Sequence, residues 1–266
     1  MNKSLIVLFL AVVLFTVTGC GKTSSAPSSA EDLLKKAEQA MNELESVHAN
    51  IAYDESSVTS DPAKRTSKNV QVQADIEQNP LKISEDVVWK IPKQGAKNIQ
   101  LFRQGDQLAM QETVETEKSE WQELTEKQRT ELLGVWVPFV SPVMDFSLLK
   151  PFLHDAEIEK IDYGYALQFS LSPADYRQLM EVVSVNSPQP EKFVHTHGGF
   201  PVVEKLDVEL TVNEKTMFVT GMKMSANVTS YFGRDYIRYK QKLDAKYSYF
   251  NDIDAISTPK DAEMFK

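Results

Sequence analysis

The residue with the most distinctive chemical setting is Cys20, the only cysteine in the 266-residue chain. It follows an N-terminal segment that carries one positive charge, Lys3, and then an apolar run of 13 residues over 5–17. A positive start, a short apolar core and small residues before a cleavage point are typical of a secretory signal peptide. The run is shorter than the roughly 20 residues that a permanent membrane helix needs. We therefore expect residues 1–19 to be removed on export.

The quartet Val17-Thr18-Gly19-Cys20 resembles the lipobox of bacterial lipoproteins. This resemblance implies that Cys20 carries a diacylglycerol thioether and that the mature chain starts there. Two acyl chains anchor a protein stably, whereas one chain binds reversibly. The predicted location is the extracytoplasmic face of a cell membrane, with that membrane as a partner through the lipid on Cys20. The alternative is an ordinary secreted protein with an unmodified cysteine.

His195 and His197 form the one local pair with metal-ligand character. Residues two apart on a strand point to the same face, so both imidazoles could reach one ion. A third ligand would have to come from His48, His154 or a carboxylate. We favour the other interpretation, two surface histidines before a glycine turn, and predict neither a metal nor a cofactor.

The sequence contains neither of the catalytic motifs GxSxG and HExxH, and lipidation of Cys20 leaves no free thiol. Gly21-Lys22-Thr23 imitates the end of a phosphate-binding loop, but the first glycine of that motif is replaced by Thr16 inside the apolar run. The abundant Asp and Glu side chains lie mainly where a strand would face water. We therefore do not expect an enzyme.

The charge balance is acidic, at −9 for the whole chain and −10 once Lys3 is lost with the leader. This balance argues against nucleic acid as a partner and against electrostatic adhesion to anionic lipid. Residues 21–29 (GKTSSAPSS) are small and polar, which favours a flexible tether. The predicted organisation is a signal peptide over 1–19, a lipidated cysteine and tether over 20–29, and a single domain over 30–266.

The first predicted element is an amphipathic helix over 30–46. Ser29 and Asp32 have the spacing of a capping box, and apolar residues from Leu33 to Leu44 recur at helical spacing. A second helix is predicted from Thr125 through 133. A third is predicted after Ser172, because proline at 173 suits the first helical position.

Elsewhere the hydrophobic period is two, which indicates antiparallel strands with one buried face. Glu85 is the one polar residue on an otherwise apolar face of its segment. Hairpin turns are predicted at 104–106, 163–164, 213–215 and 232–233. About ten strands exceed what a flat sheet tolerates. The fold class predicted is therefore α+β: a strongly curved antiparallel sheet, or incomplete β-barrel, with helices covering its concave side. The clearest strand segments are 70–77, 81–91, 205–212 and 237–249, and the weaker ones are 47–58, 97–103, 107–115, 157–162, 165–171 and 216–228.

Residues 132–153 form the most apolar segment outside the leader, and three prolines prevent one straight helix there. One interpretation is a lid of short helical pieces over a hydrophobic cavity. The other is that these residues pack as ordinary core. The candidate cavity residues, including three from a later strand, are Trp136, Phe139, Met144, Phe146, Phe218, Met222 and Met224.

Taken together, these features resemble LolA/LppX-like bacterial lipoproteins, with uncharacterised lipoproteins of Gram-positive bacteria as the most similar members. The resemblance is carried by the lipobox, the tether, the helix ending at 41–47, the strand–turn–strand passage from Ile99 to Trp121, and the ending from Tyr249 to Pro259. It implies an incomplete barrel with a helical lid around an apolar cavity that carries lipids or lipoproteins.

The function predicted from the sequence is that of a membrane-anchored extracytoplasmic lipoprotein that binds a hydrophobic ligand, such as a lipid, between the curved sheet and the lid. The alternative is a non-catalytic interaction or scaffold lipoprotein of the cell envelope, with a solid core and an envelope protein as its partner.

Overall fold

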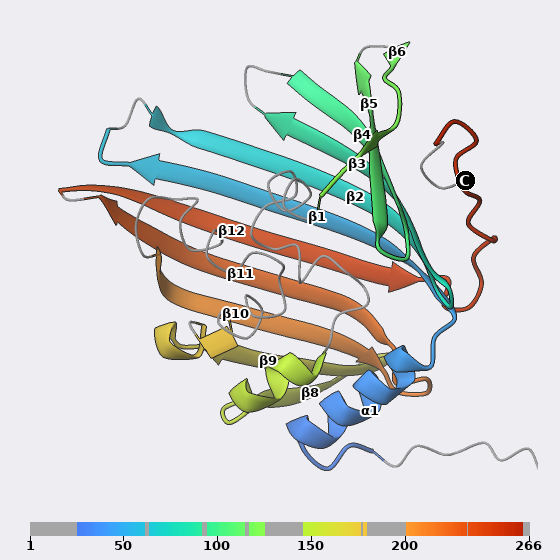
Figure 1. Ribbon diagram of the computed structural model, residues 1–266. Coiled ribbons are helices and arrows are strands. Elements are labelled where there is room, and N and C mark those ends of the chain that lie inside the picture. The colour runs from blue at the N-terminus through green and yellow to red at the C-terminus, as the bar shows by residue number, and fades with distance from the viewer. Residues whose placement is uncertain are drawn as a thin grey trace, which may run out of the picture.

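The computed structural model describes residues 26–61, 64–91, 95–114, 117–125, 146–176, 178–179, 201–232 and 234–262 (Figure 1). Within these residues, twelve strands form one antiparallel sheet in the order β6-β5-β4-β3-β2-β1-β12-β11-β10-β9-β8, and β7 pairs with β5. The two edge strands do not pair with each other, so the sheet is open, and Figure 1 shows that it is strongly curved. The predicted curved, unclosed antiparallel sheet is confirmed.

The sheet consists of two runs of neighbouring strands that meet where the first strand pairs with the last, His48–Thr59 against Ile237–Ser248. Most neighbours are joined by hairpins, and the predicted turn at Gly105 has the positive φ of 58° that favours glycine. The strands are β1 (Ser46–Thr59), β2 (Thr66–Gln78), β3 (Leu81–Ile91), β4 (Gly95–Gln104), β5 (Gln107–Val114), β6 (Glu117–Lys118), β7 (Gln122–Glu123), β8 (Glu157–Ile161), β9 (Gly164–Leu171), β10 (Pro201–Asn213), β11 (Val219–Phe232) and β12 (Asp235–Ser248).

One face of this sheet carries most of the buried side chains, and we call it the inner face. On β1 it is built by Val47, Ala49, Ile51 and Tyr53, which alternate with more exposed residues. The neighbouring strands continue the same rows, since Ile51 lies opposite Val72 on β2 and Ala245 on β12. The opposite, outer face is mostly polar, as expected for an antiparallel sheet with one wet side, although Phe102 on β4 and Ala109 on β5 are buried there.

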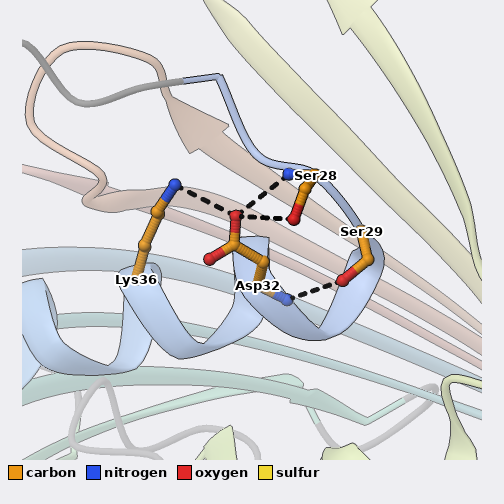
Figure 2. A network of polar contacts seen from close by, with 4 residues as sticks. All are labelled: Ser28, Ser29, Asp32 and Lys36. Atoms are coloured by element: carbon orange, nitrogen blue, oxygen red, sulfur yellow. Dashed lines mark hydrogen bonds and ion pairs between the residues drawn. The ribbon is translucent and has the colours of Figure 1, made fainter.

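Helix α1 (Ala30–Asn42) begins where the sequence predicts, and Figure 2 shows its N-terminus. The Ser29 hydroxyl accepts a hydrogen bond from the Asp32 backbone N–H at 3.2 Å. The Asp32 carboxylate accepts one from the Ser28 backbone N–H at 2.9 Å and pairs with the Lys36 ammonium at 3.0 Å. The bond from Ser28, followed by Lys36, lowers the pKa of Asp32. These contacts fix the start of the helix immediately after the predicted tether.

Helix α1 ends at Asn42, four residues before the predicted end at Ser46, because residues 43–45 form a turn that leads into β1. Ser46 opens β1 opposite Glu77 of β2. The Asn251 side-chain oxygen accepts hydrogen bonds from the backbone N–H groups of Glu45 and Ser46, at 2.7 and 3.2 Å. The predicted helix end is therefore wrong, since tertiary pairing overrides the helical pattern there.

The inward side of α1, formed by Leu33, Leu34, Ala37 and Met41, is fully buried or nearly so. The Met41 sulfur accepts a hydrogen bond from the Val219 N–H at the start of β11, at 3.3 Å. Lys150 of the 3-10 helix η2 (Phe146–Phe152) pairs with Glu38 of α1 at 2.8 Å. Helix α1 and η2 thus pack together at the end of the sheet where β11 begins.

The described helices are few, and helical cover over the whole concave side stays a prediction. Residues 173–176 and 178–179 are helical, as predicted after Ser172. The Asp175 carboxylate accepts a hydrogen bond from the Ser172 N–H at 3.0 Å, and the Ser172 hydroxyl accepts one from the Asp175 N–H at 3.3 Å. In the described ranges no helix has the length and apolar character required to span a bilayer.

Candidate functional site

The inner face changes character along the strands. Near α1 it is apolar, but at the level of residue 55 on β1 it turns polar. We use the name inner polar cluster for Tyr53 and Glu55 of β1, Lys68 of β2, Trp89 of β3 and Gln241 of β12. Glu55 lies directly opposite both Lys68 and Gln241, and Val70 lies opposite both Tyr53 and Trp89. Four neighbouring strands therefore bring these side chains together.

The Glu55 carboxylate lies at the centre of the cluster. Its Oε2 atom accepts hydrogen bonds from the Tyr53 hydroxyl at 2.6 Å and from the Gln241 side-chain amide at 2.7 Å. Two donors on one carboxylate oxygen hold that side chain in place. Burial, followed by the Glu55 charge, raises the pKa of Tyr239 on β12.

Lys68 lies beside two aromatic rings. Its Nζ atom is 4.8 Å from the centroid of the Trp89 ring and 5.8 Å from that of Tyr53. Both distances are within the range of cation–π attraction. Burial lowers the pKa of Lys68, and the charge of Glu55 opposes that change. The ammonium is thus partly desolvated, and the Glu55 charge and the two ring faces stabilise it.

The inner polar cluster has the side chains needed to bind a polar group of a ligand. Beside it, the Ser57 and Thr66 hydroxyls bond to each other at 2.6 Å. A few convergent polar groups at the end of an apolar surface are typical of a binding site for an amphipathic molecule. The absence of catalysis was expected from the sequence and stays a prediction.

Between the cluster and α1, the inner face includes a small-residue floor. Ala74 and Ala49 lie side by side in one row between Glu85 and Tyr247. Glu85, the polar exception on its predicted strand face, is 6 % exposed, and Tyr247 is 4 % exposed. Among the described residues, none forms a hydrogen bond with the Tyr247 hydroxyl, and burial raises the pKa of that group.

The outer face is hollowed in two places. A hollow of about 870 Å³ lies over β8 to β12 and β1, and carboxylates such as Asp54, Asp207 and Glu209 line it together with Lys223. A second hollow, of about 740 Å³, has Lys90, Lys240 and Lys242 among its lining residues, and Glu55 and Lys68 of the inner polar cluster also contribute to its lining. The outer face is therefore mixed in charge.

Four of the predicted cavity residues are described. Met222 and Met224 are buried on the inner face, opposite Leu210 and Val208. Phe146 is buried at the start of η2. Phe218 precedes β11 and stacks on Phe250 with ring centroids 4.8 Å apart, and a register shift at Thr211/Val212 separates it from the methionine face.

The other predicted site residues lie outside the described residues, as does the helix predicted from Thr125 to 133, apart from Thr125 itself. They are Cys20, Trp136, Phe139, Met144, His195 and His197. In the part of the chain that the structure describes, no group of three or more His, Cys, Asp or Glu residues could hold a metal ion. His48 instead pairs with Asp75 at 2.6 Å.

Glu55 and Lys68 are the functional candidates that sequence reasoning missed. A signal was present, because both residues continue the apolar phase of their strands, two residues beyond Tyr53 and two before Val70. A polar side chain in phase with buried neighbours points into the interior. Their proximity to Gln241 depends on the pairing of β1 with β12 and has no local signal.

Three comparisons bear on relatedness. No curated protein matches the chain at a significant level. Among solved structures, a DUF1329 family protein from Desulfovibrio piger ATCC 29098 aligns over 88% of this chain and 96% of its own, with a TM-score of 0.31 and 8% identity. The dehydratase domain from the CurH module of curacin polyketide synthase aligns over 74% and 77%, with a TM-score of 0.14 and 12% identity.

A family model, described as a family of unknown function (DUF6612), matches residues 29–264. The LolA/LppX-like assignment is not among these matches and stays a prediction. The match covers almost the whole predicted domain and most of the chain, so this protein belongs to the DUF6612 family.

Proposed function

We propose that this protein is a membrane-anchored, extracytoplasmic lipoprotein that holds a hydrophobic ligand, such as a lipid, against the inner face of its curved sheet. The anchor is the lipid expected on Cys20. Residues 132–153 are the proposed helical cover on the concave side, in the manner of LolA/LppX-like proteins. The inner face supplies the apolar surface and the inner polar cluster supplies the polar end.

The observation that carries this proposal is the placement of Glu55, Lys68 and Gln241 on the face that is otherwise apolar. Polar groups on a face used only for packing destabilise the fold unless they are well paired. Binding sites, by contrast, combine apolar walls with a few fixed polar groups. The cluster therefore supports binding better than it supports a solid core.

Simple energetics favour an amphipathic ligand. From Val47 to Tyr53 the apolar inner face of β1 extends about 20 Å, at roughly 3.3 Å per residue. Burial of about 200 Å² of acyl chain contributes about 5 kcal/mol at ~25 cal/mol per Å². This surface is long enough for an extended chain and apolar enough to retain it.

Native mass spectrometry of the chain from Gly21 onward, which contains every described element, tests the proposal. The expected result is a ligand-bound mass after gentle purification, and uptake of a fluorescent fatty acid after delipidation. An apo mass with no extractable lipid and no uptake would remove the binding claim.

The scaffold alternative has its own support in the outer hollow of about 870 Å³, where carboxylates and Lys223 could meet an envelope protein. It predicts that substitutions on the outer face, such as Asp207→Asn with Glu209→Gln, abolish partner capture. It also predicts that inner-face substitutions affect only stability.

A further inference from the structure

We propose that the inner polar cluster is an anion subsite, in which Lys68 and Trp89 bind the carboxylate or phosphate end of an amphipathic ligand. This inference rests on the proposed function and names the chemical class of the ligand. The acyl chain would lie on the apolar rows of the inner face, between the cluster and α1.

The first support is the state of Lys68. Its Nζ atom lies 4.8 Å from the Trp89 ring centroid and 5.8 Å from that of Tyr53, and the Glu55 charge acts on it from a distance. Across the described ranges no residue accepts a hydrogen bond from Nζ or forms a close ion pair with it. An ammonium has three donors. A partly desolvated ammonium with three free donors is therefore prepared for an acceptor from outside the fold.

The second support is the Trp89 indole. Its Nε1–H group is buried, and within the residues that the structure describes it has no hydrogen-bond partner. Buried N–H groups in native structures are nearly always paired. Because Lys68 lies against the same ring, two donor groups without acceptors are neighbours on adjacent strands.

The third support is the state of the acceptor in the cluster. The Oε2 atom of Glu55 already receives two hydrogen bonds, from Tyr53 and Gln241. A cationic headgroup would meet repulsion from Lys68, and the Glu55 charge that could attract it already interacts with Lys68, Tyr53 and Gln241. A neutral alcohol offers one oxygen to two donor groups. A carboxylate or phosphate brings several acceptor oxygens and a negative charge, so an anion fits best.

The register places the apolar part of the ligand. The row next to the Glu55–Lys68 pair contains Tyr53, Val70, Leu243 and Met224, from four strands. These side chains face inward and are only 2–4 % exposed without a ligand, so an acyl chain would have to displace the protein atoms that cover them. A headgroup at Lys68 would therefore direct its chain over Tyr53 and Val70 toward the alanine floor.

Calorimetric titration of the delipidated chain from Gly21 onward, with three ligands of equal chain length, tests the inference. The probes are hexadecanoate, hexadecyl phosphate and 1-hexadecanol. We expect at least one of the two anions to bind about tenfold more tightly than the alcohol. Preference for hexadecanoate indicates a free fatty acid, and preference for the phosphate indicates a phospholipid-type headgroup.

Substitutions connect that difference to the named residues. Lys68→Met should reduce anion affinity about tenfold and leave the alcohol unchanged. Trp89→Phe retains an aromatic face, removes the N–H donor and should weaken anion binding several-fold. Lys90→Met is the matched control, because it removes the same charge from the exposed outer face of β3. Circular dichroism of each variant confirms folding.

The outcomes separate the two proposals. If the anions and the alcohol bind equally, or if Lys68→Met and Lys90→Met behave alike, the anion subsite is wrong while ligand binding stands. If none of the three probes binds, ligand binding itself is contradicted.

Discussion

The two ends of the inner face are built by the same strands and differ in what they contain. At the apolar end, α1, η2 and the start of β11 bury aliphatic side chains such as Leu33 and Leu34. At the polar end, the same alternation delivers Glu55, Lys68 and Gln241. Strand period decides only which face a side chain occupies. The residue type then determines whether that position stabilises the fold or remains available for a ligand.

This difference predicts that the two ends contribute to different properties, the apolar end to folding stability and the polar end to ligand affinity. Substitutions at the apolar end should lower the free energy of unfolding, because buried side chains there are closely packed. Substitutions at the polar end should change stability little and ligand affinity more. Four stability measurements, from the largest expected effect to the smallest, sharpen or break this contrast.

Leu34→Ala should give the largest effect. Leu34 is completely buried between α1 and the core, so truncation should lower the free energy of unfolding by about 3 kcal/mol. Urea denaturation measures the loss, and Gln39→Ala on the exposed side of α1 is the control. Equal losses in the two variants would show that the apolar end is not a packed core.

Asn251→Gly should lower stability by about 1.5 kcal/mol, because it removes the acceptor for two backbone N–H groups at the start of β1. Glycine suits the φ of 58° at this position, so backbone strain is not added. Asn251→Asp retains the acceptor and should lose much less on thermal unfolding. The reverse order would contradict the assigned role of the side chain.

Tyr247→Phe should leave the unliganded protein equally stable or up to about 1 kcal/mol more stable, since it removes a buried hydroxyl without a described partner. Burial raises the Tyr247 pKa, so the folded state retains a proton that the unfolded chain loses above pH 10.0, and wild-type stability falls there. That alkaline fall should be smaller in the variant. If urea unfolding at pH 7 showed the variant to be less stable than wild type, the Tyr247 hydroxyl would have a hydrogen-bond partner, contrary to this assignment.

Lys68→Met should show the smallest effect, visible mainly as a pH dependence. Burial lowers the Lys68 pKa, so between that value and 10.5 the folded state binds fewer protons than the unfolded chain. Wild-type stability should therefore rise relative to the variant as pH increases through this window. Lys90→Met should show no such trend relative to wild type. If the difference in unfolding free energy between wild type and Lys68→Met did not change with pH, Lys68 would be fully solvated.

Much of the sheet could be predicted because its cause is local. The alternation of apolar and polar residues predicted the strands, and the glycine at position 105 predicted a hairpin turn, where the structure shows a positive φ. The end of α1 was misplaced because pairing of Ser46 with Glu77 is a tertiary effect. The inner polar cluster escaped prediction for a similar reason, since Glu55 and Gln241 are 186 residues apart in the sequence.

Photoaffinity labelling of the chain from Gly21 onward with a diazirine-bearing hexadecanoate, followed by peptide mapping, tests most directly whether the inner face holds a ligand. The account predicts adducts on inner-face residues such as Tyr53, Val70 and Met224, reduced by excess unlabelled hexadecanoate. Adducts confined to outer-face residues such as Asp207 and Lys223, or labelling that excess ligand does not reduce, would contradict it.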